Sequence, residues 1–102
     1  MIRGTTPTHT FTLPPNLNAS QIKRLKIIYA QGDKPLFCKE KDDCVIEGDT
    51  IQTTLTQEET FMFDCKNMVQ MQMRVLTVDG EVIASDEMYA SVEKCLDNEV
   101  MA

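Results

Sequence analysis

The sequence predicts an all-β fold, an antiparallel sandwich or partly closed barrel of seven or eight strands within one domain covering residues 1–102. Short segments alternate hydrophobic and polar residues with a period of two, which is typical of strands with one buried face. Turn residues separate these segments at roughly 8–12 residues, the spacing expected of a sandwich or barrel. The strand–helix–strand alternation of a parallel α/β sheet is missing, so that class is disfavoured.

The first half of the chain contains four predicted strands. In "THTFTL" the residues His9, Phe11 and Leu13 alternate with three threonines, and two prolines then end the strand. A polar link, "NLNASQ" at 16–21, leads to "IKRLKIIYA", which places Leu25, Ile27 and Tyr29 on one face. After the turn "QGDKP", the short strands "LFCKE" and "CVIEG" flank a charged loop at 40–43.

The second half continues the same pattern with one interruption. The segment "TIQTTL" directs alternate residues from Ile51 inward, and Thr56 followed by Glu59 fits a capping box, which predicts a short helical turn near residues 56–60. The strongest strand is "MVQMQMRVLTV", and Asp79-Gly80 predicts a two-residue hairpin turn after it. The segments "EVIAS" and "MYASVEKCL" are predicted as the last strands.

Composition and charge limit the classes of function. Hydrophobic residues make up 42% of the chain, which is too many for a disordered protein, and no apolar run approaches the ~20 residues of a membrane helix. Polar threonines occupy the place of an export signal's apolar segment, so we expect no secretion by a signal peptide and no membrane association. The net charge is −6. Nucleic-acid binding is therefore disfavoured, because phosphate contacts need a concentrated basic surface.

No residue type forms a recognisable catalytic or metal site. His9, the single histidine, is phased with hydrophobic residues and is expected to be packed or at an edge rather than catalytic. Cys38, Cys44, Cys65 and Cys95 lack the spacing of zinc ligands and are expected to be free, partly buried thiols, although a hairpin disulfide between the first two is geometrically possible. Met71 and Met73 are interpreted as core residues rather than copper ligands. We expect no cofactor, no metal and no enzyme activity.

The charge is unevenly distributed along the chain. Residues 1–40 hold six basic and two acidic side chains, whereas residues 41–102 hold four basic and fourteen acidic ones. The one basic cluster, Lys23, Arg24 and Lys26, is a candidate contact for a partner protein. Its simplest explanation is solvation and protection of a strand. The alternative is docking onto the acidic half of another copy, which would make the protein a homo-oligomer.

Four stretches carry a resemblance to known proteins: "RGTTPTHTFTLP" at 3–14, "IKRLKIIYAQGDK" at 22–34, "LTQEET" at 55–60 and "RVLTVDGEVIASD" at 74–86. They resemble a group of small proteins encoded in prophage tail-gene clusters of gut Firmicutes. The opening pattern also resembles the N-terminal immunoglobulin-like domain of phage baseplate upper proteins. This chain stops where the baseplate proteins continue into helical and receptor-binding parts, so the resemblance favours an adaptor or assembly role over attachment to a cell.

The resemblance implies a single immunoglobulin-like sandwich, with seven or eight strands, acting as a non-enzymatic component of a phage or prophage-derived tail or baseplate. Its partners would be other phage structural proteins or further copies of itself, in the host cytoplasm or on the virion. The alternative function is a cytoplasmic regulatory module that binds a peptide or small ligand. A third class is a redox- or metal-responsive protein that uses Cys38 and Cys44.

Overall fold

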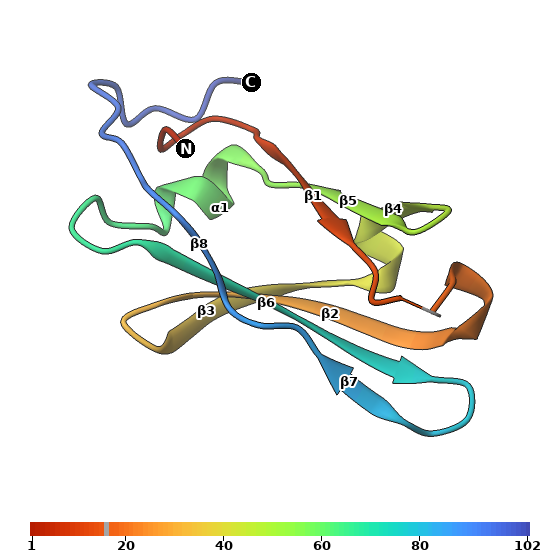
Figure 1. The fold of residues 1–102 in the computed structure, drawn as a ribbon. Helices are drawn as coiled ribbons and strands as arrows, with labels where there is room; N and C mark the ends of the chain where they lie inside the picture. Colours follow the sequence, from red (N-terminus) through yellow and green to blue (C-terminus); the bar gives the residue numbers. More distant parts are fainter. Residues whose placement is uncertain (16) are drawn as a thin grey trace.

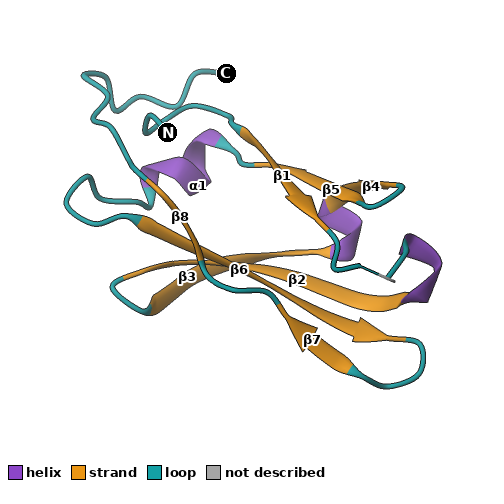
Figure 2. Ribbon diagram, in the orientation of Figure 1, coloured by secondary structure: helices purple, strands orange, loops and turns teal. Residues whose placement is uncertain are grey.

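The computed structural model describes residues 1–15 and 17–102 and forms two antiparallel sheets packed face to face (Figures 1 and 2). In the described residues, sheet I has three strands in the order β1-β5-β4, with bounds Thr8–Thr12, Thr50–Thr54 and Cys44–Glu47. Sheet II has the order β3-β2-β6-β7, with bounds Lys34–Glu40, Ile22–Gln31, Val69–Thr77 and Val82–Ala84, and β8 (Met88–Ala90) also pairs with β6. These eight strands confirm the predicted all-β sandwich.

The order of the strands matches that of an immunoglobulin sandwich. Sheet I corresponds to the immunoglobulin strands B, E and D, and sheet II to C′, C, F and G, where β7 and β8 together follow the edge of β6. The connections β1–β2, β3–β4 and β5–β6 cross from one sheet to the other, whereas β2–β3, β4–β5 and β6–β7 are pairs of adjacent antiparallel strands. This connectivity is a Greek key.

The alternating residues meet in one core between the sheets. Sheet I contributes Phe11 and Ile51, and sheet II contributes a row of buried side chains from β2 and β6: Leu25, Ile27, Tyr29, Val69, Met71, Met73 and Val75. The faces predicted for these strands are confirmed. Met71 and Met73 pack in this core, as expected of flexible side chains that fill irregular space.

Two hairpins use turns that depend on positive φ angles. Gly32 (φ 58°) and Asp33 (φ 62°) connect β2 to β3 in the geometry of a two-residue type I′ turn. The β6–β7 hairpin has a three-residue loop, Val78–Gly80, so the predicted two-residue turn at Asp79-Gly80 is wrong. The Gly80 amide donates to the Thr77 carbonyl and the Thr77 amide donates to the Glu81 carbonyl, so a type I turn is followed by glycine at φ 87°.

The predicted helical turn is confirmed as α1, Gln57–Phe61. Thr56 Oγ1 accepts from the Glu59 amide, and the Glu59 carboxylate accepts from the Thr56 amide, which completes the capping box. Two short 3₁₀ segments also occur: η1, Ala19–Gln21, in the predicted polar link, and η2, Lys41–Asp43, in the charged loop. Asn16, the first residue of that link, lies outside the described residues.

The strand predicted over 88–96 is shorter than expected, because β8 pairs with β6 only through Ala90. Val69 is the first residue of β6 and faces Ala90, so no partner extends beyond it. The following residues turn to the start of the chain instead. The Arg3 amide donates to the Glu93 carbonyl, and Ile2 forms a parallel bridge with Glu93.

The opening residues also pack on α1. The Arg3 guanidinium lies 5.4 Å from the centre of the Phe61 ring and donates to the Phe61 carbonyl. Gly4, at φ 80°, brings its backbone so close to this ring that a Cβ atom there would stand 2.6 Å from Phe61 Cζ. The Gly4 amide donates to Thr60 Oγ1. A larger residue at this position would therefore strain the backbone and displace the Phe61 ring, and both effects favour glycine.

Candidate interaction surface

The outer face of sheet II gathers basic side chains from two adjacent strands. Arg24 and Lys26 lie on β2, and Arg74 of β6 stands directly opposite Lys26 in the strand register. Together with Leu76 and Val82 they line a hollow of about 160 Å³, which we call the basic hollow. Val82 is 56% exposed, so a large apolar side chain lies in the open beside the three cations.

The facing pair Lys26 and Arg74 is expected to destabilise the fold of the isolated protein. Like charges directly opposite each other on neighbouring strands destabilise a sheet. Arg24 is partly neutralised, since its guanidinium forms an exposed ion pair with Glu40 at 3.2 Å. Among the described residues, neither Lys26 nor Arg74 forms an ion pair with a carboxylate. These two cations are therefore available to a carboxylate of another molecule.

The three predicted contact residues are not all in one place. Arg24 and Lys26 line the basic hollow, whereas Lys23 lies at a β-bulge between Ile22 and Arg24 and is not part of the lining. The hollow gains Arg74 instead. The sequence did not identify Arg74 as a contact residue, because the register that joins β6 to β2 is a long-range property.

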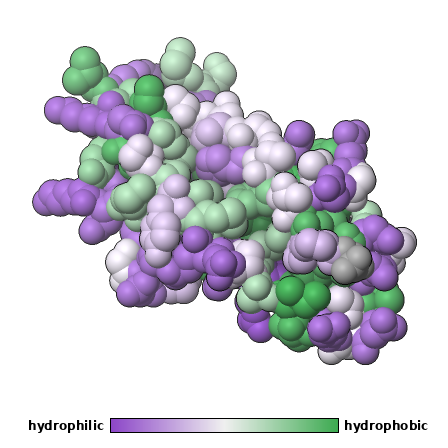
Figure 3. All heavy atoms as spheres, viewed as in Figure 1, coloured by the Kyte–Doolittle hydropathy of each residue, from purple (hydrophilic) through white to green (hydrophobic). Residues whose placement is uncertain are grey.

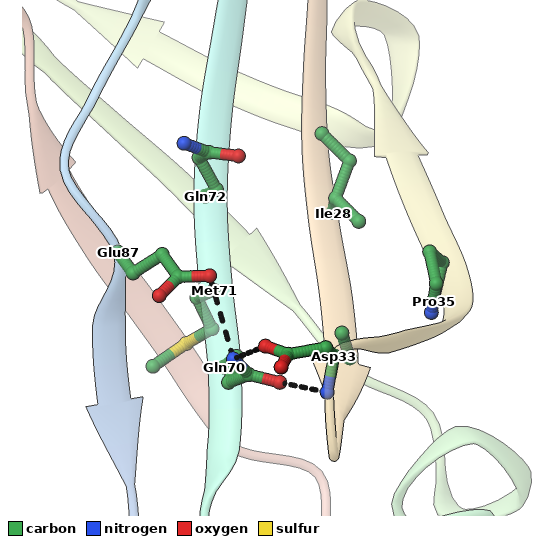
Figure 4. Close-up of a pocket in the computed structure, with 8 residues that line it drawn as sticks. Ile28, Asp33, Pro35, Gln70, Met71, Gln72 and Glu87 are labelled. Carbon is green, nitrogen blue, oxygen red and sulfur yellow. Dashed lines mark hydrogen bonds between the residues drawn. The ribbon is translucent and has the colours of Figure 1, made fainter.

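A second hollow, of about 250 Å³, lies on the same face near the β2–β3 turn (Figure 4). The Gln70 amide nitrogen donates to Asp33 Oδ1 at 2.7 Å and to Glu87 Oε1 at 3.4 Å, and the Gln70 oxygen accepts from the Asp33 amide. Tyr89 donates its hydroxyl proton to Glu87. The Gln70 side chain thus uses both ends of its amide to hold the positive-φ turn against β6, which is a structural role.

A third hollow, of about 270 Å³, lies where the β1–β2 connection meets the β6–β7 hairpin. The β1–β2 connection contributes Pro14, Pro15 and Leu17, and the hairpin places the carboxylates of Asp79 and Glu81 at the lining. The Val78 amide donates to the Gln21 carbonyl and ties the two segments together. In immunoglobulin sandwiches, loops at the ends of the sheets often carry binding sites.

His9 has a partner inside the sandwich. Its Nδ1 atom lies 2.8 Å from the hydroxyl oxygen of Tyr29, which is fully buried and stacks on Phe37. Burial raises the pKa of Tyr29, and the nearby Cys44 and Glu59 raise it further. Burial and the N-terminal ammonium lower the pKa of His9. The protonated phenol therefore donates to a neutral imidazole, in a packed position as expected for this histidine.

An ion pair lies beside this aromatic group. Lys39 Nζ contacts Glu59 Oε1 at 2.6 Å, which joins β3 to α1. Burial acts to raise the pKa of Glu59, but hydrogen bonds from Lys39 and the Thr56 amide outweigh it, so the pKa is lower than usual. His9, Cys44 and Glu59 line none of the three hollows described above. Their polar atoms instead form hydrogen bonds with neighbouring residues of the protein.

The cysteines are free thiols, as predicted, although only Cys44 and Cys95 are partly buried. Cys38 is exposed on β3 of sheet II, whereas Cys44 belongs to β4 of sheet I, so the alternative of a hairpin disulfide is not realised. Across residues 1–15 and 17–102, no three His, Cys, Asp or Glu side chains gather in a way that could hold a metal ion. No helix of that same part of the chain has the length and hydrophobicity to cross a bilayer.

Comparisons with known proteins identify no relative of this chain. No protein-family model, curated protein or solved structure matches the chain significantly. The class of protein is therefore defined by the fold: an antiparallel β-sandwich with immunoglobulin strand order and an exposed basic hollow on its larger sheet.

Proposed function

We propose that this protein is a non-enzymatic assembly component of a phage or prophage-derived tail, and that its basic hollow binds an acidic surface of a partner protein. The observation that carries the proposal is the pairing of Lys26 with Arg74 beside exposed Val82. Cations next to an open apolar side chain fit a partner that offers carboxylates around a hydrophobic residue. The stretches that resemble prophage tail-cluster proteins and the domain of baseplate proteins support the biological setting.

The partner is another tail protein or the acidic half of a further copy. Fourteen of the sixteen acidic residues lie in 41–102, so the chain itself offers the complementary charge. In either case the site of action is the host cytoplasm during assembly or the finished virion. Contacts of this kind need only surface complementarity, and they are consistent with the small, open hollows on sheet II.

The proposal is tested by whether the protein joins tail particles. Particles purified from a strain that carries the surrounding genes are expected to contain a fixed number of copies, measured by quantitative mass spectrometry. The copies should be released as salt rises from about 0.1 M to about 1 M, because screening shortens the reach of exposed charges. Arg74→Glu is expected to reduce incorporation about tenfold or more, equivalent to ~1.4 kcal/mol of binding energy.

Lys66→Glu is the matched control, since it makes the same change of charge at an exposed residue outside the basic hollow. Particles that form without this protein, or that hold Arg74→Glu and wild-type protein equally, would contradict the proposal.

A second function, a regulatory module that binds a peptide, is favoured by the hollow at the β1–β2 and β6–β7 loops. Its prolines and Leu17 offer an apolar floor, and Asp79 and Glu81 offer carboxylates for a basic side chain. A Lys- or Arg-containing peptide that binds wild-type protein but not Asp79→Asn, measured by calorimetry, would establish this function. The basic-hollow variants would leave that binding unchanged.

A further inference from the structure

Strand β1 is an edge strand whose backbone is open on one side. Sheet I has the order β1-β5-β4, and Figure 1 shows β1 at the border of the sheet, with β5 and β4 beyond it. The Leu13 amide donates to the Asp49 carbonyl and the Leu55 amide donates to the Pro7 carbonyl, so odd-numbered residues of this segment pair with β5. The amides and carbonyls of Thr8, Thr10 and Thr12 therefore point away from the sheet.

The other sheet edges are blocked in ways that β1 is not. On β3, Pro35 and a register shift interrupt the strand, and the Glu40 amide is bonded to Asp43. On β4 the Cys44 amide is bonded to the Lys41 carbonyl, and the strand is four residues long. The edge formed by β7 and β8 is broken between Ala84 and Met88. β1 contains no proline, no bulge and no Lys, the usual devices against edge pairing.

Sheet I is also uncharged along this border. Neither Thr8–Thr12 nor Thr50–Thr54 contains Asp, Glu, Lys or Arg, although 25% of the chain is charged. Copies with a net charge of −6 repel one another over most of their surface. They can approach with least repulsion where this strip of threonines faces itself. Figure 3, viewed as Figure 1, shows hydrophobic and hydrophilic residues interspersed over this face of the molecule.

We propose that two copies of this chain associate by pairing β1 with β1 in antiparallel orientation, which joins the two copies of sheet I into one continuous sheet. A two-fold axis between the two Thr10 residues places Thr10 of one copy opposite Thr10 of the other. Thr8 of each copy then lies opposite Thr12 of the other copy. All outward amides and carbonyls of the three threonines are then paired, with two hydrogen bonds in each facing pair. The threonine side chains meet across the junction on the outer face, where Thr–Thr pairs are favourable.

This inference does not depend on the proposed function, because β1 and the basic hollow lie in different sheets. The strand that pairs with β1 is the β1 strand of a second copy rather than a strand of a different protein. The register is self-complementary, and the strip carries no charge that would select a different partner. A two-fold contact of this type closes on itself and yields a dimer rather than a filament.

Sedimentation velocity over a range of protein concentrations tests the dimer. Wild-type protein is expected to show a reversible monomer–dimer equilibrium that salt does not weaken. Thr10→Pro removes the outward amide while leaving the β1–β5 ladder in place, since proline is tolerated on an edge strand when its missing N–H faces outward. Thr10→Lys keeps the backbone but sets like charges opposite each other at the axis. Both variants should weaken dimerisation about tenfold or more.

Gln52→Lys is the matched control. Gln52 faces Thr10 in the β1–β5 register, so this variant introduces the same charge one strand away from the edge. It should dimerise like wild type. A wild-type monomer at every concentration would overturn the proposal, and so would a dimer that Thr10→Pro and Thr10→Lys both leave intact. A dimer that Arg74→Glu abolishes while the Thr10 variants retain it would also overturn it, and would instead support the basic hollow as the contact between copies.

Discussion

The two sheets of the sandwich differ in the chemistry that they present. Sheet I offers an uncharged border of threonines with an open backbone edge, whereas sheet II offers Arg24, Lys26 and Arg74 on its face and has interrupted edges. The first can associate through main-chain hydrogen bonds and the second through side-chain charge. Each sheet buries only one face in the shared core, so its other surfaces remain free. A small sandwich can therefore offer two separate contact sites, one on each sheet.

The largest expected effect tests whether the sheets depend on each other. Phe63, which follows α1, is buried in the shared core against the aromatic pair Tyr29 and Phe37, so Phe63→Ala leaves a cavity there. We predict a loss of about 3–5 kcal/mol in the free energy of unfolding, measured by denaturant titration. Met62→Ala, at a half-exposed neighbour, should lose less than about 0.5 kcal/mol. Separate transitions for the two sheets would show that they do not share one core.

A smaller effect is expected at the ion pair that fastens α1 to sheet II. Lys39→Met removes the cation from Glu59, whose side chain is 22% exposed, and should cost about 2 kcal/mol of stability. Because the pKa of Glu59 is lowered in the folded protein, its contribution is present above the ordinary glutamate pKa and is lost as pH falls through the lowered value. Stability measured against pH should therefore fall less steeply in acid for Lys39→Met. The double variant Lys39→Met with Glu59→Gln should recover part of the loss, and equal acid sensitivity in all three proteins would contradict this role.

The smallest effect concerns the histidine that connects the sheets. The pKa of His9 is lowered in the folded protein. As pH falls from about 7 to about 5, His9 therefore binds a proton in the unfolded chain before it does so in the folded one. The protein should lose stability over that interval, by an amount on the order of one hydrogen bond, ~1 kcal/mol. His9→Gln should flatten the dependence. The comparison is made by thermal unfolding, and an unchanged slope in His9→Gln would mean that another group titrates there.

Local patterns were sufficient to predict the strand faces and the capped helical turn. Leu25, Ile27 and Tyr29 are inward because period two is a property of the strand itself, and Thr56 with Glu59 is a signal within four residues. Such signals do not reveal which strands become neighbours.

The features that the sequence did not predict depend on long-range contacts. Arg74 joins the basic hollow through the register of β6 against β2, and β8 ends where β6 begins. Glycine is favoured at position 4 because the Phe61 ring, far away in the chain, packs against it. The open edge of β1 follows from strand order, since the same alternation would be expected of a strand with neighbours on both sides.

Amide hydrogen exchange at single-residue resolution tests most directly whether sheet I associates through its backbone. Exchange at Thr8, Thr10 and Thr12 should slow as protein concentration rises, while the amide of Phe11, which faces β5 in the register, keeps one rate throughout. If the three threonine amides exchange at the same fast rate in dilute and concentrated protein, the edge of β1 is not a site of self-association.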